Sequence, residues 1–208
     1  MNNKILSLKF YSRPTLKVAQ ELLGCLLVRK YRGKIWRARI TETEGYAGED
    51  DLASHASRGR TPRTELMYGE PGRAYVYMIY GMYHCLNIVT EKKDFPAAVL
   101  IRGVELTDVR PHSSLAARSN LLNVGMDFRG RTASRHRKQT DPNLNGPGKL
   151  CKFLKIDRKL NGWDITKGEK LWIEKPAQNF SKKNIVAGRR IGVDYAKHCK
   201  EYLWRFHI

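Results

Sequence analysis

The sequence lacks several features that would place it in other classes of protein. It has no apolar run of the roughly 18 residues that a membrane span needs, and its opening stretch is too weakly apolar for a signal peptide because Lys9 interrupts it. Its 4 cysteines form no Cys-x-x-Cys pair, so neither a zinc site nor a redox motif is expected. Cys25, Cys85 and Cys151 lie among apolar neighbours. We therefore expect reduced core thiols in a cytoplasmic protein that does not associate with membranes.

Acidic residues are scarce relative to basic ones. The chain has 39 lysines and arginines against 20 aspartates and glutamates, a net charge of +19. This excess favours a polyanionic partner, because each neutralised phosphate releases bound counterions. A solvated or ribosome-associated basic protein would have the same composition. A membrane surface is disfavoured because no basic amphipathic helix stands out. The charge therefore predicts nucleic acid as the partner.

The length and the distribution of strand-like runs indicate the fold class. The 208 residues can form one domain with a hydrophobic core, and no linker divides them, so we expect a single domain over residues 1–208. Strand-like runs outnumber helical ones, which is typical of an α+β fold. Helices are expected to start at Ser12–Pro14 and at Pro147, with a third at 113–124. Two strands are expected within 25–46, three within 73–106, and one each in KLWIE and YLWRF. Loops are expected at 48–72 and 127–148.

Four tyrosines fall within the stretch YVYMIYGMYHCLN, residues 75–87, which predicts a β-hairpin because Gly81 is its one turn residue. A three-residue loop, Tyr80–Met82, would set residue 79 opposite 83. A two-residue loop would mix apolar and polar side chains on each face, so the apolar pattern favours the longer loop. The expected core face carries Val76, Met78, Leu86 and Ile88, and the other face carries Tyr75, Tyr77, Tyr83, Cys85 and Asn87.

Tyr80 is then expected at the tip of the hairpin. A ring on a tight hairpin can push between stacked bases. On the polar face, Tyr77 could stack on a base, a contact worth about 1–3 kcal/mol, and the Asn87 amide could contact a base edge. Alternatively, these tyrosines are structural and pack on neighbouring elements. The tip position of Tyr80 is the feature that this alternative explains least well.

Glu42 and Glu44 occupy alternate positions in the strand-like stretch ARITETEGY. Carboxylates at the end of an apolar strand face indicate an acid held partly desolvated for chemistry, although a strand that reaches solvent would look the same. In so basic a chain, a carboxylate that faces DNA weakens phosphate binding, so we expect it to serve a specific purpose. Strict alternation would align both glutamates with three apolar residues, Trp36, Ala38 and Ile40.

Several segments together resemble one family of enzymes. They are ETEGYAGEDDLASH, RGRTPRTELMYGEPGRAYVYMIYGMYHCLN, VLIRGVEL, NGPGKLCKFL, RIGVDYA and LWRF, in this order. They resemble the alkyladenine (3-methyladenine) DNA glycosylase family in its bacterial form, from about Leu6 to the C-terminus. The departures are local: Thr64, Gly103 and Leu106 stand where the family often has Asn, Ala and Pro.

The resemblance implies a fold and an activity. The fold would be a single α+β domain around a curved, mostly antiparallel sheet with flanking helices and a protruding hairpin. The activity would be the cofactor-independent removal of alkylated or deaminated purines from double-stranded DNA, namely 3-methyladenine, 7-methylguanine, hypoxanthine and ethenoadenine. The enzyme would be a nucleoid-associated monomer with no obligate protein partner and no metal.

The resemblance also implies residue roles. Glu44 matches the catalytic carboxylate, Arg102 the arginine beside the catalytic water, and the Val193 carbonyl a group that holds this water. Tyr80 matches the residue that replaces the flipped nucleotide. The remaining matches are Tyr46, His55 and Tyr77, which would sandwich the base with His55 on the Tyr46 side, Asn87, which would crowd a guanine 2-amino group, and Met67, which would contact DNA near the opposite strand. Lys149, beside the helix start expected at Pro147, is a further candidate for contact with DNA.

Three rival functions stay open at this point. A bifunctional glycosylase would use Lys149 as a nucleophile. A non-catalytic module would bind nucleic acid by tyrosine stacking alone. A metal-dependent nuclease would use a cluster around Asp50 and Asp51, although their spacing matches no strong metal signature.

Overall fold

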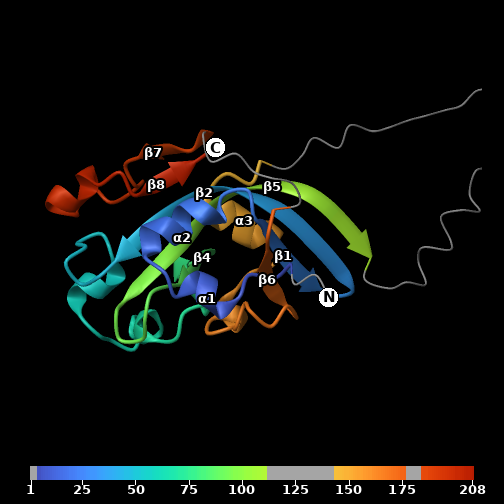
Figure 1. Cartoon of the computed structure of the whole chain (residues 1–208), viewed down its shortest axis with the longest axis horizontal. Helices are drawn as coiled ribbons and strands as arrows, with labels where there is room; N and C mark the ends of the chain where they lie inside the picture. Colours follow the sequence, from blue (N-terminus) through green and yellow to red (C-terminus); the bar gives the residue numbers. More distant parts are fainter. Residues whose placement is uncertain (1–3, 112–142, 177–183) are drawn as a thin grey trace, which may run out of the picture.

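Two long strands, β2 (Lys34–Ala47) and β5 (Ala97–Pro111), pair antiparallel and curve across the molecule (Figure 1). They belong to a computed structural model that describes residues 4–111, 143–176 and 184–208. The sheet order is β3-β4-β5-β2-β1-β6, with β8 paired to β2 and β7 to β8, and the pairings within these described residues are all antiparallel. The other strands are β1 (Leu26–Tyr31), β3 (Ala74–Ile79), β4 (Tyr83–Val89), β6 (Leu171–Glu174), β7 (Val186–Gly188) and β8 (Arg205–His207).

Short helices flank this sheet. Helix α2 packs on β2 and β5, and α3 packs on β4 and β5. Together with the sheet they enclose the main apolar core, which confirms the α+β class and the curved antiparallel sheet. Within the described ranges, none of the helices has the length and apolar character to cross a bilayer. The helices are α1 (Leu8–Tyr11), α2 (Thr15–Leu22) and α3 (Pro147–Phe153), with 3-10 turns η1 (His55–Arg58), η2 (Glu65–Tyr68), η4 (Arg158–Leu160) and η6 (Lys197–Glu201).

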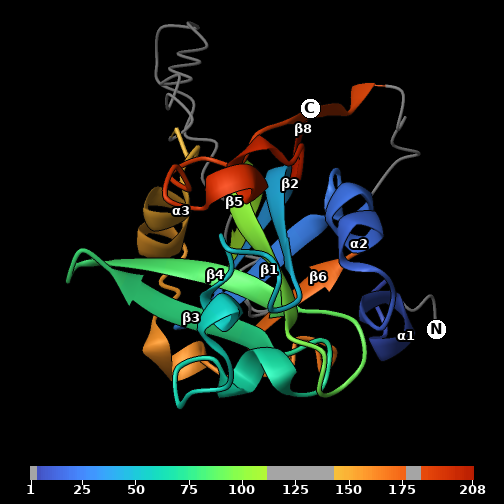
Figure 2. The ribbon, with the colours of Figure 1, turned by 90° about the vertical axis from the view of Figure 1, so that its left-hand side faces the viewer.

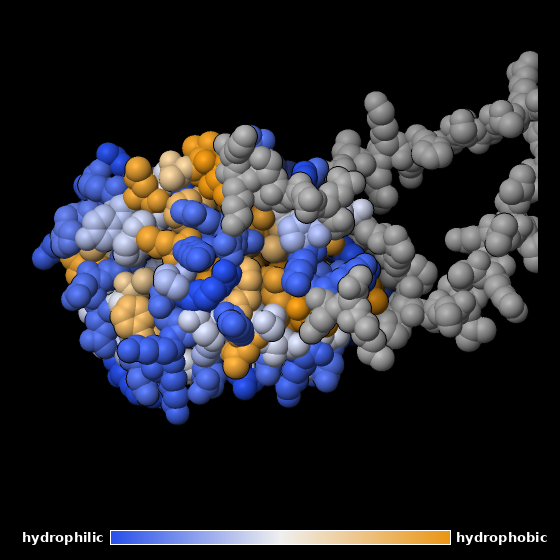
Figure 3. Space-filling view, viewed as in Figure 1, coloured by the Kyte–Doolittle hydropathy of each residue, from blue (hydrophilic) through white to orange (hydrophobic). Residues whose placement is uncertain are grey.

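Most local expectations are confirmed, with small shifts at the ends of elements. Helix α2 begins directly after Pro14, and β1 and β2 join through a turn at Arg32–Gly33, where both residues have positive φ. The expected YLWRF strand is wrong for residues 202–204, because pairing begins at residue 205. The helix expected at 113–124 and most of the basic loop at 127–148 lie outside the described residues. The face in Figure 3 is largely hydrophilic with scattered apolar side chains, as the composition predicts.

The tyrosine hairpin has the predicted register. Ile79 pairs with Tyr83, Tyr77 with Cys85, and residue 75 with residue 87, around the loop 80–82. Figure 2 shows the β3–β4 hairpin extending beyond the rest of the sheet. Val76, Leu86 and Ile88 lie in the core as expected, whereas Met78 near the tip is only half-buried.

The expected alternation along β2 is wrong beyond Ile40. The register with β5 slips between Ile40 and Glu42, and again between Glu42 and Thr43. An inserted residue in one strand of a pair is a β-bulge, which changes the face that the following side chains occupy. Ile40 lies in the core, and Thr43 rather than Glu42 continues on that side, where its hydroxyl donates to the Ala19 carbonyl of α2.

The residues after the bulge confirm this change of face. Gly45 lies against α2 so closely that a Cβ there would be 2.7 Å from Cδ2 of Leu16. Glu44 and Tyr46, on either side of it, therefore point away from the core and line a cleft on the opposite face. The bulge thus allows one strand to contribute to the core and then to present a carboxylate to the cleft.

Candidate active site

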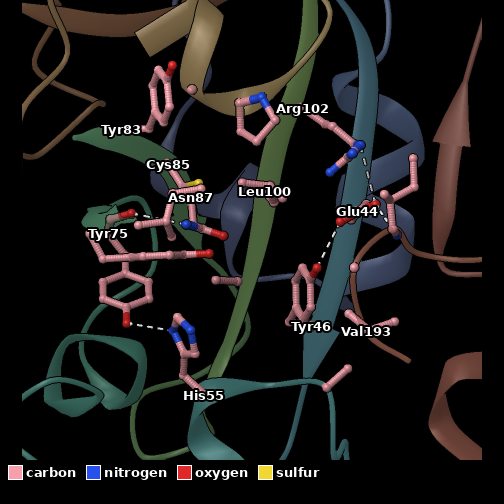
Figure 4. Close-up of a pocket in the computed structure, with 18 of the residues that line it drawn as sticks. Glu44, Tyr46, His55, Tyr75, Tyr83, Cys85, Asn87, Leu100, Arg102 and Val193 are labelled. Carbon is pink, nitrogen blue, oxygen red and sulfur yellow. Dashed lines mark hydrogen bonds and ion pairs between the residues drawn. The ribbon is translucent and has the colours of Figure 1, made fainter. Parts of the chain in front are cut away.

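A cleft of about 500 Å³ lies on the face of the sheet that carries the tyrosines. Its walls come from β2, the hairpin, β5, the segment between β2 and β3, the start of α3, and residues 191–195 (Figure 4). The fold therefore brings together all ten residues predicted for the site: Glu44, Tyr46, His55, Met67, Tyr77, Tyr80, Asn87, Arg102, Lys149 and Val193.

Glu44 is completely buried at the base of this cleft. Its Oε1 accepts a hydrogen bond of 2.9 Å from the Ile191 backbone N–H, and its Oε2 accepts one of 2.8 Å from the Tyr46 hydroxyl. Burial raises the pKa of this carboxyl above 4.5, and the nearby Arg102 charge and the two donors oppose the rise. The site therefore holds a partly desolvated carboxylate in a fixed orientation.

Arg102 is shared between two carboxylates. Its Nε lies 3.2 Å from Oε1 of Glu42 and 3.6 Å from Oε1 of Glu44. Glu42 also accepts a hydrogen bond of 3.0 Å from Nη1 of Arg205 on β8. The pairing of Glu42 with Arg205 was not predicted, because it depends on β8 lying beside β2.

The aromatic residues form two groups rather than the expected arrangement. His55 lies against Tyr77 with ring centroids 4.6 Å apart in an edge-to-face contact, and its Nδ1 is 3.0 Å from the Tyr75 hydroxyl. Tyr46 stands apart from them, beside Glu44 (Figure 4). The prediction that His55 lies on the Tyr46 side is therefore wrong. The edge contact with Tyr77 and the hydrogen bond to Tyr75 hold His55 on the hairpin side of the cleft.

The contacts of His55 also determine its tautomer. Its Nε2 lies 3.3 Å from Nη2 of Arg63, and a guanidinium can only donate. Nε2 is therefore the acceptor, and Nδ1 carries the hydrogen that is donated to Tyr75. Burial lowers the pKa of His55 to about 4, and the charges of Arg63 and Arg58 contribute, so the imidazole is neutral at physiological pH.

The remaining predicted residues occupy different depths of the cleft. Tyr80 is 86% exposed at the hairpin tip, and Lys149 is exposed at the start of α3. Met67 is only 2% exposed and packs on the Tyr75 side of the wall, a position that offers almost no surface to DNA. The Asn87 amide is buried, and its Nδ2 donates to the Tyr75 carbonyl.

The Val193 carbonyl accepts a hydrogen bond from the Ala196 N–H. A carbonyl oxygen has two lone pairs, so one remains for a further donor. Val193 is nearly buried where residues 191–195 close the cleft beside Glu44.

A buried ion pair behind the cleft was missed by the sequence analysis. Both side chains of the Asp51–Arg190 pair are completely buried, with Nη1 to Oδ2 at 2.6 Å and Nη2 to Oδ1 at 2.7 Å. Asp51 is thus engaged by a guanidinium, and Asp50 is exposed. Across the part of the chain that the structure describes, no group of histidine, cysteine or acidic side chains could hold a metal ion.

The fold and the site together define a class of protein. A buried carboxylate beside an arginine, in a cleft lined with aromatic rings on a chain of charge +19, is the arrangement of a hydrolytic enzyme that acts on nucleic acid. The family model for methylpurine-DNA glycosylase matches residues 9–208. The chain belongs to this family, and it is a DNA glycosylase that acts in the repair of alkylated bases.

Relatives support this assignment over nearly the whole chain. A protein of Clostridium perfringens (strain SM101 / Type A) is 44% identical over 201 residues, which cover 96% of this chain and 93% of the relative. A protein of Desulfitobacterium hafniense (strain Y51) is 43% identical over 99% of this chain and 95% of its own length. A protein of Methanocella arvoryzae is 45% identical over 98% of this chain and 92% of its own length. All three carry the name "Putative 3-methyladenine DNA glycosylase".

Proposed function

We propose that this chain is a monofunctional glycosylase that turns alkylated or deaminated purines out of double-stranded DNA and hydrolyses their N-glycosidic bonds with a water molecule activated by Glu44. The substrates inferred are 3-methyladenine, 7-methylguanine, hypoxanthine and ethenoadenine, and the names of the relatives support the first. One observation carries the proposal: Glu44 is completely buried, yet it is oriented by two donors and a guanidinium at the base of an aromatic cleft.

Recognition begins at the hairpin tip. Tyr80 has φ +50 and the following Gly81 has φ +69, so a bulky residue occupies a left-handed position where Gly or Asn is usual. Such a conformation costs on the order of 1 kcal/mol and is typical of functional sites. An exposed ring on this tight turn can occupy the space that a rotated nucleotide leaves in the duplex.

The extruded base then enters the cleft. We infer that it stacks between Tyr46 on one side and the His55–Tyr77 pair on the other, since these two groups stand apart in the cleft. A neutral His55 suits this position, because an imidazolium would repel a cationic alkylated purine. Asn87 would meet the edge of the base and disfavour a guanine 2-amino group.

Hydrolysis exchanges one bond for another at the deoxyribose. The C1′–N bond breaks with its electron pair passing to the purine, the water oxygen bonds to C1′, and Glu44 accepts the proton of the water. The Glu44 charge also stabilises the oxocarbenium character that develops on the sugar. Arg102 and the second lone pair of the Val193 carbonyl would orient the water. A cationic purine leaves as a neutral base, whereas a neutral purine gains a proton as it leaves.

Glu44→Gln tests the proposal. The glutamine keeps the shape of the side chain but cannot accept the proton of the water, so free-base release from single-lesion duplexes should fall by about 10²–10⁴-fold or more. Lesion binding should be retained. Glu105→Gln is the matched control, because it makes the same change at an exposed carboxylate on β5. Undiminished release by Glu44→Gln would remove this residue from the mechanism.

The rival functions predict different results with the wild-type protein. A covalent adduct trapped by borohydride would favour Lys149 as nucleophile, and its absence would favour water. Salt-sensitive binding without release of free base would indicate a non-catalytic module. Loss of activity with a chelator would indicate a metal-dependent nuclease. We propose that the enzyme acts as a monomer in the cytoplasm, at the nucleoid, without an obligate protein partner or a cofactor.

A further inference from the structure

The buried guanidinium of Arg190 contacts the catalytic strand directly. Besides its two bonds to Asp51, its Nη1 donates to the Gly45 carbonyl at 2.9 Å and its Nη2 donates to the Cys199 carbonyl at 3.1 Å. Gly45 lies between Glu44 and Tyr46 in β2. One guanidinium therefore links the strand of the carboxylate to the segment between β2 and β3 and to η6.

Two aromatic rings contact the same guanidinium. Its Cζ lies 4.8 Å from the centroid of the Tyr46 ring and 5.0 Å from that of the Trp204 ring. A guanidinium stacked on aromatic rings restricts the orientation of each ring. Trp204 is itself fixed to the strand, because the Gly45 N–H donates to its carbonyl at 2.8 Å.

Both hydrogen-bond donors of Glu44 depend on these contacts. The Tyr46 hydroxyl that donates to Oε2 belongs to the ring stacked on Arg190. The backbone N–H that donates to Oε1 belongs to Ile191, the residue directly after Arg190. A displacement of Arg190 would therefore move both donors relative to the carboxylate.

We propose that Arg190, held by Asp51, is a positioning residue that fixes the orientation of Glu44 through the Tyr46 hydroxyl and the Ile191 N–H. Arg190 is not among the residues that line the cleft, and the charge of Asp51 offsets its own at a distance of 2.6 Å. Its contribution is orientation rather than net positive charge. This inference rests on the proposed role of Glu44 as the base of the reaction.

The groups that face Glu44 determine its pKa, so the pH dependence of the excision rate reports whether they keep their positions. They are Arg102 on β5 and Cys85 on β4, Glu42 and Tyr46 on the same strand as Glu44, and the Ile191 N–H, with Arg190 behind them. The N–H and hydroxyl donors stabilise the charged carboxylate. If Arg190 positions them, its replacement shifts the acid limb of the excision rate to higher pH, because Glu44 then ionises less readily. A purely structural role would lower the amount of folded enzyme without this shift.

Arg190→Lys and Trp204→Leu test the proposal under single-turnover conditions. The lysine keeps the charge but loses the bidentate and stacked geometry, and the leucine removes one ring of the stack while leaving the ion pair. At neutral pH we expect excision of hypoxanthine from a duplex to fall by about 10²-fold in Arg190→Lys, the typical effect of misplacing a reacting group by about 1 Å. Trp204→Leu should show a smaller loss, and both variants should show the acid limb at higher pH.

Arg189→Lys is the matched control. Arg189 directly precedes Arg190 in the chain but is exposed and pairs with Glu201 on the surface, so this variant should keep the wild-type rate and pH profile. Exchange of the Ile191 amide proton, followed by NMR, gives a readout that is independent of activity. This proton should exchange faster in Arg190→Lys and Trp204→Leu than in the wild type.

The outcomes separate this inference from the proposed function. Undiminished excision by Glu44→Gln would overturn both. An inactive Glu44→Gln, together with an unshifted acid limb and unchanged Ile191 exchange in folded Arg190→Lys and Trp204→Leu, would overturn only the positioning role. If Arg190→Lys does not fold, the same two measurements on Trp204→Leu decide the question.

Discussion

Arg102 lies closer to Glu42 than to Glu44, with its Nε 3.2 Å from the first carboxylate and 3.6 Å from the second. Glu44 is completely buried, whereas the Glu42 side chain retains some contact with solvent. The guanidinium of Arg102 is therefore shared between Glu44, the carboxylate proposed as the base of the reaction, and a second carboxylate beside it. Glu42 also raises the pKa of Glu44 by like-charge repulsion, after the larger effect of burial.

Glu42→Gln should shift the acid limb of the excision rate to lower pH. The substitution removes a negative charge near Glu44 and leaves Arg102 paired with one carboxylate, so Glu44 ionises more readily. At neutral pH the rate should change by less than about tenfold, because the reacting groups are untouched. Single-turnover excision over a pH series measures the effect. An acid limb at higher pH would show that Glu42 instead holds Arg102 in place.

Glu44→Gln should make the protein more stable at neutral pH. Folding raises the pKa of Glu44 above 4.5, so folding favours the protonated carboxyl. This contribution to stability is fully present below pH 4.5 and is lost as pH rises through the pKa of the folded state. The neutral glutamine avoids the loss. Urea unfolding should give a higher free energy of unfolding for the variant at neutral pH and no such advantage below pH 4.5. A lower value at neutral pH would contradict this interpretation.

Tyr80→Ala should separate folding from base extrusion. The side chain is 86% exposed, so the free energy of unfolding should change by less than about 0.5 kcal/mol. Loss of a ring that fills the duplex should weaken capture of an extruded base by roughly tenfold or more. Fluorescence of 2-aminopurine beside the lesion reports extrusion, and Tyr80→Trp, which keeps an aromatic ring, serves as the control. An unchanged fluorescence response in Tyr80→Ala would contradict the role of the hairpin tip.

His55 should remain neutral throughout the physiological pH range. Burial and the neighbouring arginines lower its pKa to about 4 from an ordinary value of 6.5. The imidazole resonances in an NMR titration should therefore move only near pH 4, and His55→Gln identifies them by their loss. A transition near pH 6.5 would show that the ring is more solvated than its contacts with Tyr75 and Arg63 indicate.

The hairpin was predictable because its information is local. Alternation of apolar residues on both sides of Gly81 is sufficient to set the pairing of Ile79 with Tyr83, and this register is observed. The resemblance to a known family identified nine of the ten predicted site residues, all except Lys149, and all ten line one cleft. These residues are far apart in the sequence, but motif similarity identifies them without any knowledge of which side chains touch in the fold.

Other features depend on partners that no local pattern reveals. The bulge in β2 arises from its register with β5, so alternation alone placed Glu44 on the same face as Ile40. Arg189 and Arg190 are adjacent and chemically identical, yet only Arg190 is buried, because only its charge is neutralised by a buried carboxylate, that of Asp51. Asp51 lies 139 positions away in the sequence, so no local pattern distinguishes the two arginines. A buried guanidinium can be recognised only when the group that neutralises it is known.

The C-terminal segment that supplies Ile191, Val193 and Trp204 has a consequence for synthesis of the enzyme. Synthesis runs from the N-terminus, so Glu44 and Tyr46 on β2 are made well before Ile191, whose N–H donates to Glu44, and Trp204, whose ring contacts the same guanidinium as Tyr46. On the mechanism proposed, a nascent chain that has not yet reached Ile191 lacks one of the two hydrogen-bond donors of Glu44, so it should release little or no free base from DNA even if its tyrosine hairpin has formed.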